Sequence, residues 1–200
     1  DMLRAWEVLD YGWKLRRARE AEEDMRRVDV VPHLRRAGVG QVHLEALRTP
    51  DNKRPLMSAL RCWLEQQRTP EGRMPHPWLA LLGLTGAGKT QAAVVALAYF
   101  VRRYPWNSAA GGGSEARPFV LAHGSEVAAL ARQLRDFSAA AGARERETDW
   151  RRCQVLVLDD VGAEKLDADA LSLLHSVADE RYRTRRVTVW TGNLSLLELE

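Results

Sequence analysis

Eight consecutive residues, from Gly83 to Thr90, form the clearest chemical pattern in the sequence. Their order, Gly-Leu-Thr-Gly-Ala-Gly-Lys-Thr, matches the spacing G-x-x-x-x-G-K-[ST] of a phosphate-binding loop. Glycines allow the backbone to curve around an anion, so that its N–H groups and the start of a following helix point at phosphate oxygens. Lys89 would then reach the β- and γ-phosphates, and the Thr90 hydroxyl would bind Mg²⁺. The alternative is an ordinary glycine-rich turn between a strand and a helix.

The sequence on either side of this loop favours a nucleotide site over a simple turn. The apolar run Trp78-Leu79-Ala80-Leu81-Leu82 precedes the loop and is typical of a buried strand, and the alanine- and valine-rich segment from Gln91 to Tyr104 predicts a helix. Strand, loop and helix in this order are the context that the motif requires. We therefore expect a nucleoside triphosphate to bind at Gly83, Thr85, Gly86, Ala87, Gly88, Lys89, Thr90 and Gln91.

Two adjacent acids, Asp159 and Asp160, end a second apolar run that begins at Cys153. A hydrophobic strand that ends in acids downstream of a phosphate-binding loop is the Walker B pattern. Asp159 would hold the hydrated magnesium ion, and Asp160 would orient and polarise the attacking water. The alternative is a strand that ends in a polar turn. A third polar residue, Asn193, follows the run from Val187 to Thr191 and is predicted to end beside the γ-phosphate.

Strands and helices alternate along the chain, which predicts a parallel sheet with right-handed crossovers. Four strands are predicted, at residues 78–82, 119–123, 153–158 and 187–191. Ser125 is the expected N-cap of a helix that runs to about Ala141, and a polar link is expected from Gly142 to Arg152. Residues 34–47 are expected to form a loop and a turn. Ligands of such sheets bind at the carboxyl ends of the strands, where the loop, the two acids and Asn193 all fall.

The composition is that of a globular unit with a charged N-terminal extension. The 200 residues are 46% hydrophobic and 28% charged, and the net charge of +3 permits contact with nucleic acid without arguing for it. Met2 to Val28 predicts a charged helix, so we divide the chain into an arm at residues 1–31 and a nucleotide-binding domain at residues 32–200. No apolar stretch approaches the roughly 18 residues of a membrane span. The two distant cysteines have neither zinc nor disulfide spacing. We expect a cytoplasmic protein with no membrane contact.

From about Leu34 to Leu199 the chain resembles the AAA+ ATPases of the DnaC/DnaI helicase-loader and IstB transposition-helper group. The resemblance rests on the phosphate-binding loop, on residues 155–165 around the two acids, on Asp179-Glu180-Arg181-Tyr182 and on Thr191-Gly192-Asn193-Leu194-Ser195. It implies an α/β fold of the P-loop NTPase (AAA+/ASCE) type that binds ATP and Mg²⁺. It also implies that Asn193 is the sensor-1 residue and that Asp160 is the catalytic acid, where many AAA+ proteins have glutamate. Subunits of the family assemble into a ring or spiral, with ATP bound between neighbours.

The chain departs from the family pattern after sensor 1. AAA+ sheets hold five parallel strands, with the fifth beside the P-loop strand, whereas only four are predicted here. In the family the arginine finger, the sensor-2 arginine and the helical lid all follow sensor 1, at positions beyond Glu200. We therefore expect the 200-residue chain by itself to bind ATP, to turn it over slowly and to stay mostly monomeric. A longer chain is expected to assemble.

Arginines cluster in two segments that precede predicted strands, at residues 144–152 and 181–186. The resemblance makes them candidates for contacts with the phosphates of single-stranded DNA, and we single out Arg183, Arg185 and Arg186. Loops before the strands lie at the end of the sheet opposite the nucleotide, which argues against a role in ATP binding. A solvated rim is the alternative interpretation for any one of these arginines.

Four functions are compatible with these patterns. The first is an ATPase that loads or regulates a replicative helicase on single-stranded DNA. The second is a transposition helper that delivers a transposase to target DNA. A small-molecule kinase could use the same phosphate loop, but it leaves the acid pair and Asn193 unexplained. The fourth is a binding switch gated by the nucleotide, in which turnover is incidental.

Overall fold

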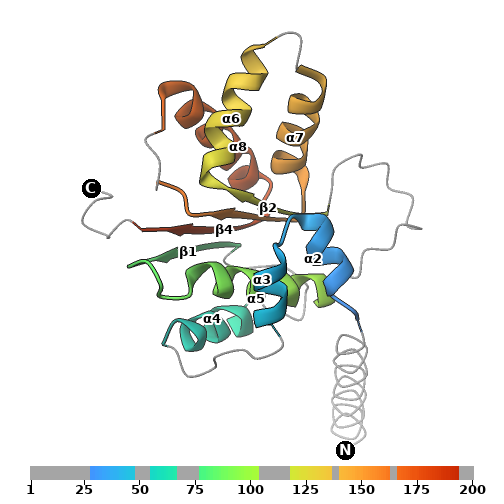
Figure 1. The fold of residues 1–200 in the computed structure, drawn as a ribbon, viewed down its shortest axis with the longest axis vertical. Coiled ribbons are helices and arrows are strands. Elements are labelled where there is room, and N and C mark those ends of the chain that lie inside the picture. The colour runs from blue at the N-terminus through green and yellow to red at the C-terminus, as the bar shows by residue number, and fades with distance from the viewer. Residues whose placement is uncertain are drawn as a thin grey trace, which may run out of the picture.

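A parallel β-sheet organises the chain (Figure 1). The computed structural model describes residues 28–47, 55–66, 77–103, 118–136, 140–162 and 166–193. Within these residues the strands are β1 (Trp78–Leu82), β2 (Phe119–His123), β3 (Val155–Asp159) and β4 (Val187–Gly192). Their order across the sheet is β1-β4-β3-β2, and all three neighbouring pairs are parallel. The prediction of a parallel α/β sheet is confirmed.

The register of the strands aligns their carboxyl ends. Leu82 pairs with Gly192, Leu158 pairs with Trp190, and His123 pairs with Asp159. The phosphate loop follows β1, and the paired acids lie at the end of β3. Because β4 lies between β1 and β3, this one strand is all that separates the loop from the acids. The sheet therefore brings three segments, distant in sequence, to one edge, as expected for a ligand site in a parallel sheet.

Helices cover both faces of the sheet (Figure 1). On one face α5 packs against β1, β3 and β4, and α2, α3 and α4 pack against α5. On the other face α6, α7 and α8 pack against one another. The first group consists of α2 (Val31–Ala37), α3 (Gln41–Ala46), α4 (Pro55–Gln66) and α5 (Lys89–Arg103). The second consists of α6 (Gly124–Arg135), α7 (Ala140–Arg152) and α8 (Ala168–Arg183).

Strand β3 supplies apolar side chains to the cores on both faces. Val155 and Val157 join the cluster that contains α5, whereas Leu156 and Leu158 join the cluster that contains α6 and α8. Successive residues of a strand point to opposite faces, so a central parallel strand must be apolar at every position. This double burial explains the uninterrupted apolar run that precedes Asp159, and it holds the acid at the end of a rigid element.

Three local predictions were wrong. Residues 34–47 form two short helices, α2 and α3, rather than a loop and a turn. The two glycines there separate the helices: Gly38 ends α2 with φ at 102°, and a Cβ on it would lie 2.8 Å from the Leu121 carbonyl oxygen. The segment expected to be a polar link is most of α7, whose Ala143 and Trp150 are buried. Helix α6 begins at Gly124 with His123 as its N-cap, so Ser125 is not the cap.

Several predicted features lie outside the described residues. They are residues 2–27 of the predicted charged helix and Tyr104, the last residue of the helix predicted from Gln91. The same holds for the residues that follow Asn193. Among the residues that the structure describes, no helix is long and apolar enough to cross a membrane.

Candidate active site

The phosphate loop connects β1 to α5 and depends on glycine at three positions. Gly83, Gly86 and Gly88 have φ values of 141°, 82° and 87°, in the region that side chains rarely adopt. A Cβ added to Gly83 or Gly86 would meet no atom within 4 Å, so the backbone conformation rather than lack of space requires glycine there. Thr85 and Ala87 lie in the same loop, with the Ala87 N–H donating to the Leu84 carbonyl at 3.3 Å.

Lys89 begins α5 and is 7% exposed. Its ammonium group donates to the carbonyl oxygens of Gly83 at 2.8 Å and Leu84 at 2.9 Å, and to Oδ1 of Asn193 at 2.9 Å. All three acceptors are neutral, so none of them cancels the positive charge. A cation held at a curved loop and a helix N-terminus suits the β- and γ-phosphates of a nucleotide. The loop thus fits a triphosphate.

Thr90 and Asp159 place hard oxygen atoms next to the phosphate loop. The Thr90 hydroxyl lies 2.9 Å from Oδ1 and 3.1 Å from Oδ2 of Asp159, whose side chain is buried. Magnesium prefers oxygen ligands and is usually held by one or two protein groups together with water and phosphate oxygens. Across the described ranges no group of three or more His, Cys, Asp or Glu side chains is placed to hold a metal ion. The pair of Thr90 and Asp159 suits Mg²⁺ bound with a nucleotide better than a metal ion held by protein alone.

Asp160 and Asn193 meet beside this pair. Asn193 donates from Nδ2 to Oδ1 of Asp160 at 2.9 Å, while its own Oδ1 accepts from Lys89. Asn193 therefore links the phosphate loop to the second acid. Asp160 itself has φ at 56°, a left-handed conformation that is uncommon for a residue other than glycine. The predicted residues Lys89, Thr90, Asp159, Asp160 and Asn193 are thus brought together.

Gln91 lies in the first turn of α5, as predicted, but its carboxamide has no hydrogen-bond partner among the described residues. Two further residues lie at the site without having been singled out from the sequence. The Thr191 hydroxyl contacts both acids, and Nδ1 of His123 lies 3.5 Å from Oδ2 of Asp159. Both placements follow from strand register, since His123 is the partner of Asp159 across β2 and β3.

Small residues allow the segments to approach each other closely. A Cβ on Gly124 would lie 2.5 Å from the Asp160 carbonyl oxygen, and a Cβ on Gly192 would lie 2.9 Å from the Val161 carbonyl oxygen. Gly124 directly follows the last residue of β2, and Gly192 is the last residue of β4. A glycine at the carboxyl end of a predicted strand is the sequence signal that could have indicated these contacts.

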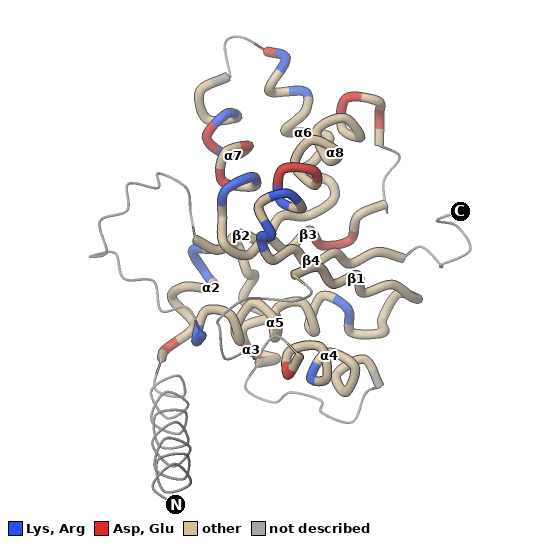
Figure 2. Tube along the Cα trace, turned by 180° about the vertical axis from the view of Figure 1, so that it is seen from behind, with Lys and Arg blue, Asp and Glu red and all other residues tan. Residues whose placement is uncertain are grey.

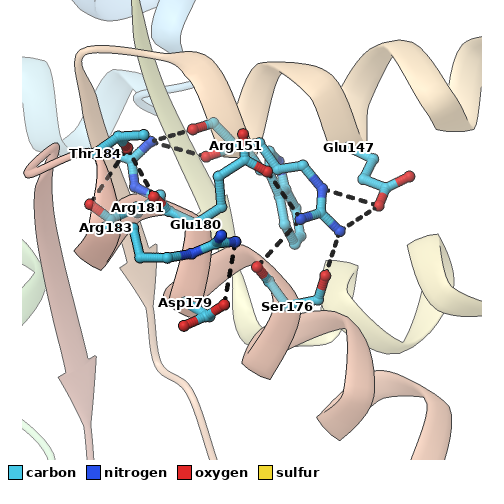
Figure 3. A network of polar contacts seen from close by, with 9 residues as sticks. Glu147, Arg151, Ser176, Asp179, Glu180, Arg181, Arg183 and Thr184 are labelled. Atoms are coloured by element: carbon cyan, nitrogen blue, oxygen red, sulfur yellow. Dashed lines mark hydrogen bonds and ion pairs between the residues drawn. The ribbon is translucent and has the colours of Figure 1, made fainter.

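The arginines at the end of α7 and those between α8 and β4 lie near the amino ends of β3 and β4, away from this site, whereas the other arginines of the first cluster lie farther back along α7 (Figure 2). Arg183 is exposed and forms an ion pair with Asp179 at 3.2 Å, as Figure 3 shows. Arg185 is exposed with φ at 52°, and Arg186 donates to the Arg152 carbonyl. Arg181 is the exception within the cluster.

Arg181 was grouped with the rim arginines, and that placement is wrong because its side chain is completely buried. Its guanidinium donates to the carbonyl oxygens of Trp150 at 2.8 Å and Cys153 at 2.9 Å, and to the Thr188 hydroxyl at 2.9 Å. Burial lowers the pKa of Arg181 below its ordinary value. Trp150 lies in the last turn of α7 and Cys153 follows the helix. Their carbonyl oxygens stabilise this cation.

The fold and the site define a P-loop NTPase. The family model of the IstB-like ATP binding protein matches residues 76–200, more than half of the chain, and the chain belongs to this family. Among solved structures, the crystal structure of the DnaC helicase loader is similar with a TM-score of 0.54 and 21% sequence identity. The similar region covers 78% of this chain and 81% of that chain. A comparison with curated protein sequences found no match. The protein is an ATP-binding protein of the AAA+ type.

Proposed function

We propose that this protein hydrolyses ATP with Mg²⁺, using the residues that meet at the carboxyl ends of β1, β3 and β4. The observation that carries this proposal is a continuous series of contacts from Lys89 through Asn193 to Asp160. Asn193 can report on a phosphate near Lys89 and at the same time orient the Asp160 carboxylate. Asp160 then accepts a proton from water or holds it in line for attack on the γ-phosphate.

Removing only the charge of the second acid tests this proposal. Asp160→Asn should keep ATP affinity within about threefold of the parent, while phosphate release falls by about a hundredfold or more, as expected for loss of a general base. The affinity is measured by calorimetry with Mg²⁺ and the rate by phosphate release. The matched control is Asp169→Asn, which removes one half-buried acid, paired with Arg135, from the first turn of α8.

Equal hydrolysis by Asp160→Asn and the parent would reject Asp160 as the catalytic residue. Phosphate release by the parent protein also distinguishes an ATPase from a small-molecule kinase and from a binding switch. A small-molecule kinase would release little phosphate without its acceptor, and a binding switch would bind ATP tightly with negligible turnover. An ATPase of this class is instead expected to be stimulated by single-stranded DNA or by its protein partner.

We further propose that the ATPase acts on a replicative helicase, loading or regulating it on single-stranded DNA. The similarity in fold to a helicase loader supports this part of the proposal. The second candidate is a transposition helper, and the match to the IstB-like family favours it. Binding of the purified protein, with ATP, to a replicative helicase and to a transposase from the same source distinguishes the two.

The proposal also concerns assembly and domain organisation. Residues 32–200 would form the nucleotide-binding domain and residues 1–31 a separate arm. Subunits would associate into a ring or spiral, so that ATP lies between neighbours when the lid is present. Sedimentation of a chain extended past Glu200 by a lid, with ATP and single-stranded DNA and without them, tests the association. A mass that does not change under any of these conditions would contradict it.

A further inference from the structure

The hydroxyl group of Thr191 contacts both acids of the site at once. It donates to Oδ1 of Asp159 at 2.6 Å and accepts from the backbone N–H of Asp160 at 2.8 Å. Thr191 lies near the end of β4 and is 1% exposed. A hydroxyl has one hydrogen to donate and can accept from a second group. These two contacts therefore use the Thr191 side chain in both ways.

The backbone of Thr191 strengthens this connection between β4 and the residues after β3. Its carbonyl oxygen accepts from the N–H of Val161 at 2.8 Å. Successive amides, at residues 160 and 161, are therefore bound by one residue of the neighbouring strand. Asp160 lies between β3 and Val161 with a φ of 56°, which residues with a side chain rarely adopt. Such a conformation persists where the surrounding structure holds it in place.

The contacts of Thr191 complete a closed ring around the site. From Thr90 the ring passes to Asp159, to Thr191 and to Asp160, and from Asp160 through Asn193 to Lys89, the neighbour of Thr90 in the chain. Thr191 is the member that joins the proposed magnesium ligand to the proposed catalytic acid. Without it Asp159 and Asp160 would be joined only by the backbone between them and by the longer path through Thr90, Lys89 and Asn193.

We propose that Thr191 is a positioning residue, whose hydroxyl fixes the carboxylate of Asp159 and the left-handed backbone of Asp160. The hydroxyl would keep Asp159 turned toward Thr90 and Asp160 turned toward Asn193. This inference rests on the proposed ATPase function, but it makes a structural statement that can be tested without nucleotide. It also assigns a function to β4 in addition to that of Asn193, the residue that follows this strand.

Thr188 provides a matched control in the same strand. It is also 1% exposed, and its hydroxyl also makes two contacts, accepting from Nε of Arg181 at 2.9 Å and donating to the Arg186 carbonyl at 3.2 Å. These contacts lie at the amino end of β4, away from the acids. Replacing either threonine by valine keeps the branched shape and removes the hydroxyl, which leaves a buried donor without its acceptor in both cases. A comparison of the two variants therefore separates positioning from general loss of stability.

The first measurement is amide hydrogen exchange without nucleotide. Thr191→Val should accelerate exchange at the Asp160 amide by about tenfold or more, because that N–H loses its acceptor and can open locally. Thr191→Ser, which restores a hydroxyl, should return exchange to within about threefold of the parent. Thr188→Val should leave the Asp160 amide unchanged. If Thr191→Val fails to fold, Thr191→Ala is used in its place. Unchanged exchange at Asp160 in the folded variant would overturn the proposal.

The second measurement is the dependence of turnover on Mg²⁺. Thr191→Val should lower kcat by about tenfold, equivalent to 1.4 kcal/mol in the barrier, and raise the Mg²⁺ concentration for half-maximal rate several-fold. Binding of ATP in EDTA should stay within about threefold of the parent, because Lys89 and the loop are unchanged. Thr191→Ser should recover the rate. A Thr191→Val protein with the parent's kcat and Mg²⁺ dependence would overturn the proposal. A parent without phosphate release would instead reject the ATPase function, and the exchange experiment would still decide about Thr191.

Discussion

Lys89 shows how one side chain can depend on the fold of distant segments. Its ammonium group is held between the loop at the end of β1 and Asn193 at the end of β4, with only neutral acceptors among its three partners. A buried cation without a carboxylate partner is costly unless an anion comes to it. The triphosphate of ATP is the natural partner for this charge, and the neutral oxygens hold the ammonium where the phosphates are expected.

Replacing Lys89 by alanine should therefore weaken ATP binding by about a hundredfold or more, since the variant loses a charge-assisted contact to the phosphates. The domain should remain folded, because Lys89 belongs to neither of the apolar core clusters. Calorimetry with Mg²⁺ measures the affinity, and circular dichroism checks the fold. Arg102→Ala, at the exposed far end of α5, is the control. The site assignment fails if the Lys89→Ala protein and the parent bind ATP equally well.

At the scale of secondary-structure elements, the sequence predicted a helix or strand correctly where the residues that indicate it follow each other directly. The strand, loop and helix at residues 78–103 were predicted because the apolar run, the glycines and the lysine follow each other directly. Helix α7 was missed because its charged residues suggested a link, although only Ala143 and Trp150 need to be apolar for it to pack. In α2 and α3 the glycines mark helix ends rather than a loop.

Prediction of the candidate site from the sequence was also limited to residues that belong to a local pattern. Lys89, Thr90, Asp159, Asp160 and Asn193 occupy motif positions, so their spacing alone predicted that they would meet. The contacts of Thr191 and His123 with the acids depend on which residues face each other across β2, β3 and β4. That register arises from the packing of both faces of the sheet and has no local pattern in the sequence. The burial of Arg181 was missed for a similar reason, because its acceptors come from α7, β4 and the residues before β3.

The buried junction around Arg181 also contains Cys153, and it gives a prediction about pH. Burial raises the pKa of the Cys153 thiol from 9.0 to about 11, although the adjacent Arg181 guanidinium opposes the increase. The thiol of the unfolded chain loses its proton near pH 9, whereas the folded protein retains it until about pH 11. The resulting stability is fully present below pH 9 and is lost as the pH rises toward 11, by on the order of 2 kcal/mol.

Urea unfolding between pH 8 and 11 measures this effect. Compared with the parent, Cys153→Ala should lose less stability across this interval, because the thiol that titrates has been removed. The exposed Cys62 provides the control, since Cys62→Ala should keep the pH dependence of the parent. Identical pH dependence in Cys153→Ala and the parent would show that the Cys153 thiol does not have a raised pKa.

At the scale of the whole molecule, the sheet separates two kinds of surface. The carboxyl ends of β1, β3 and β4 hold the candidate nucleotide site, whereas the amino ends of β3 and β4 adjoin the arginines (Figure 2). Arg181 has no part in that surface because it is buried, and the pairing of Arg183 with Asp179 reduces the net charge. Arg185, which extends from a left-handed turn, and Arg186 are the remaining basic residues before β4. Binding at the two ends should therefore be affected by different substitutions.

Reversing the charges of Arg183, Arg185 and Arg186 together tests this separation. The triple glutamate variant should bind single-stranded DNA more weakly, and the slope of log affinity against log salt should flatten by about two, because up to three phosphate contacts are lost at about 0.7 per contact. Its affinity for ATP with Mg²⁺ should match that of the parent, since the site at the other end of the sheet is untouched. Glutamates at Arg35, Arg36 and Arg102, all exposed and on the α5 side, apply the same change in net charge elsewhere. Equal salt slopes in the two triple variants would mean that DNA binding depends only on the net charge of the protein. The arginines before β4 would then be a solvated rim.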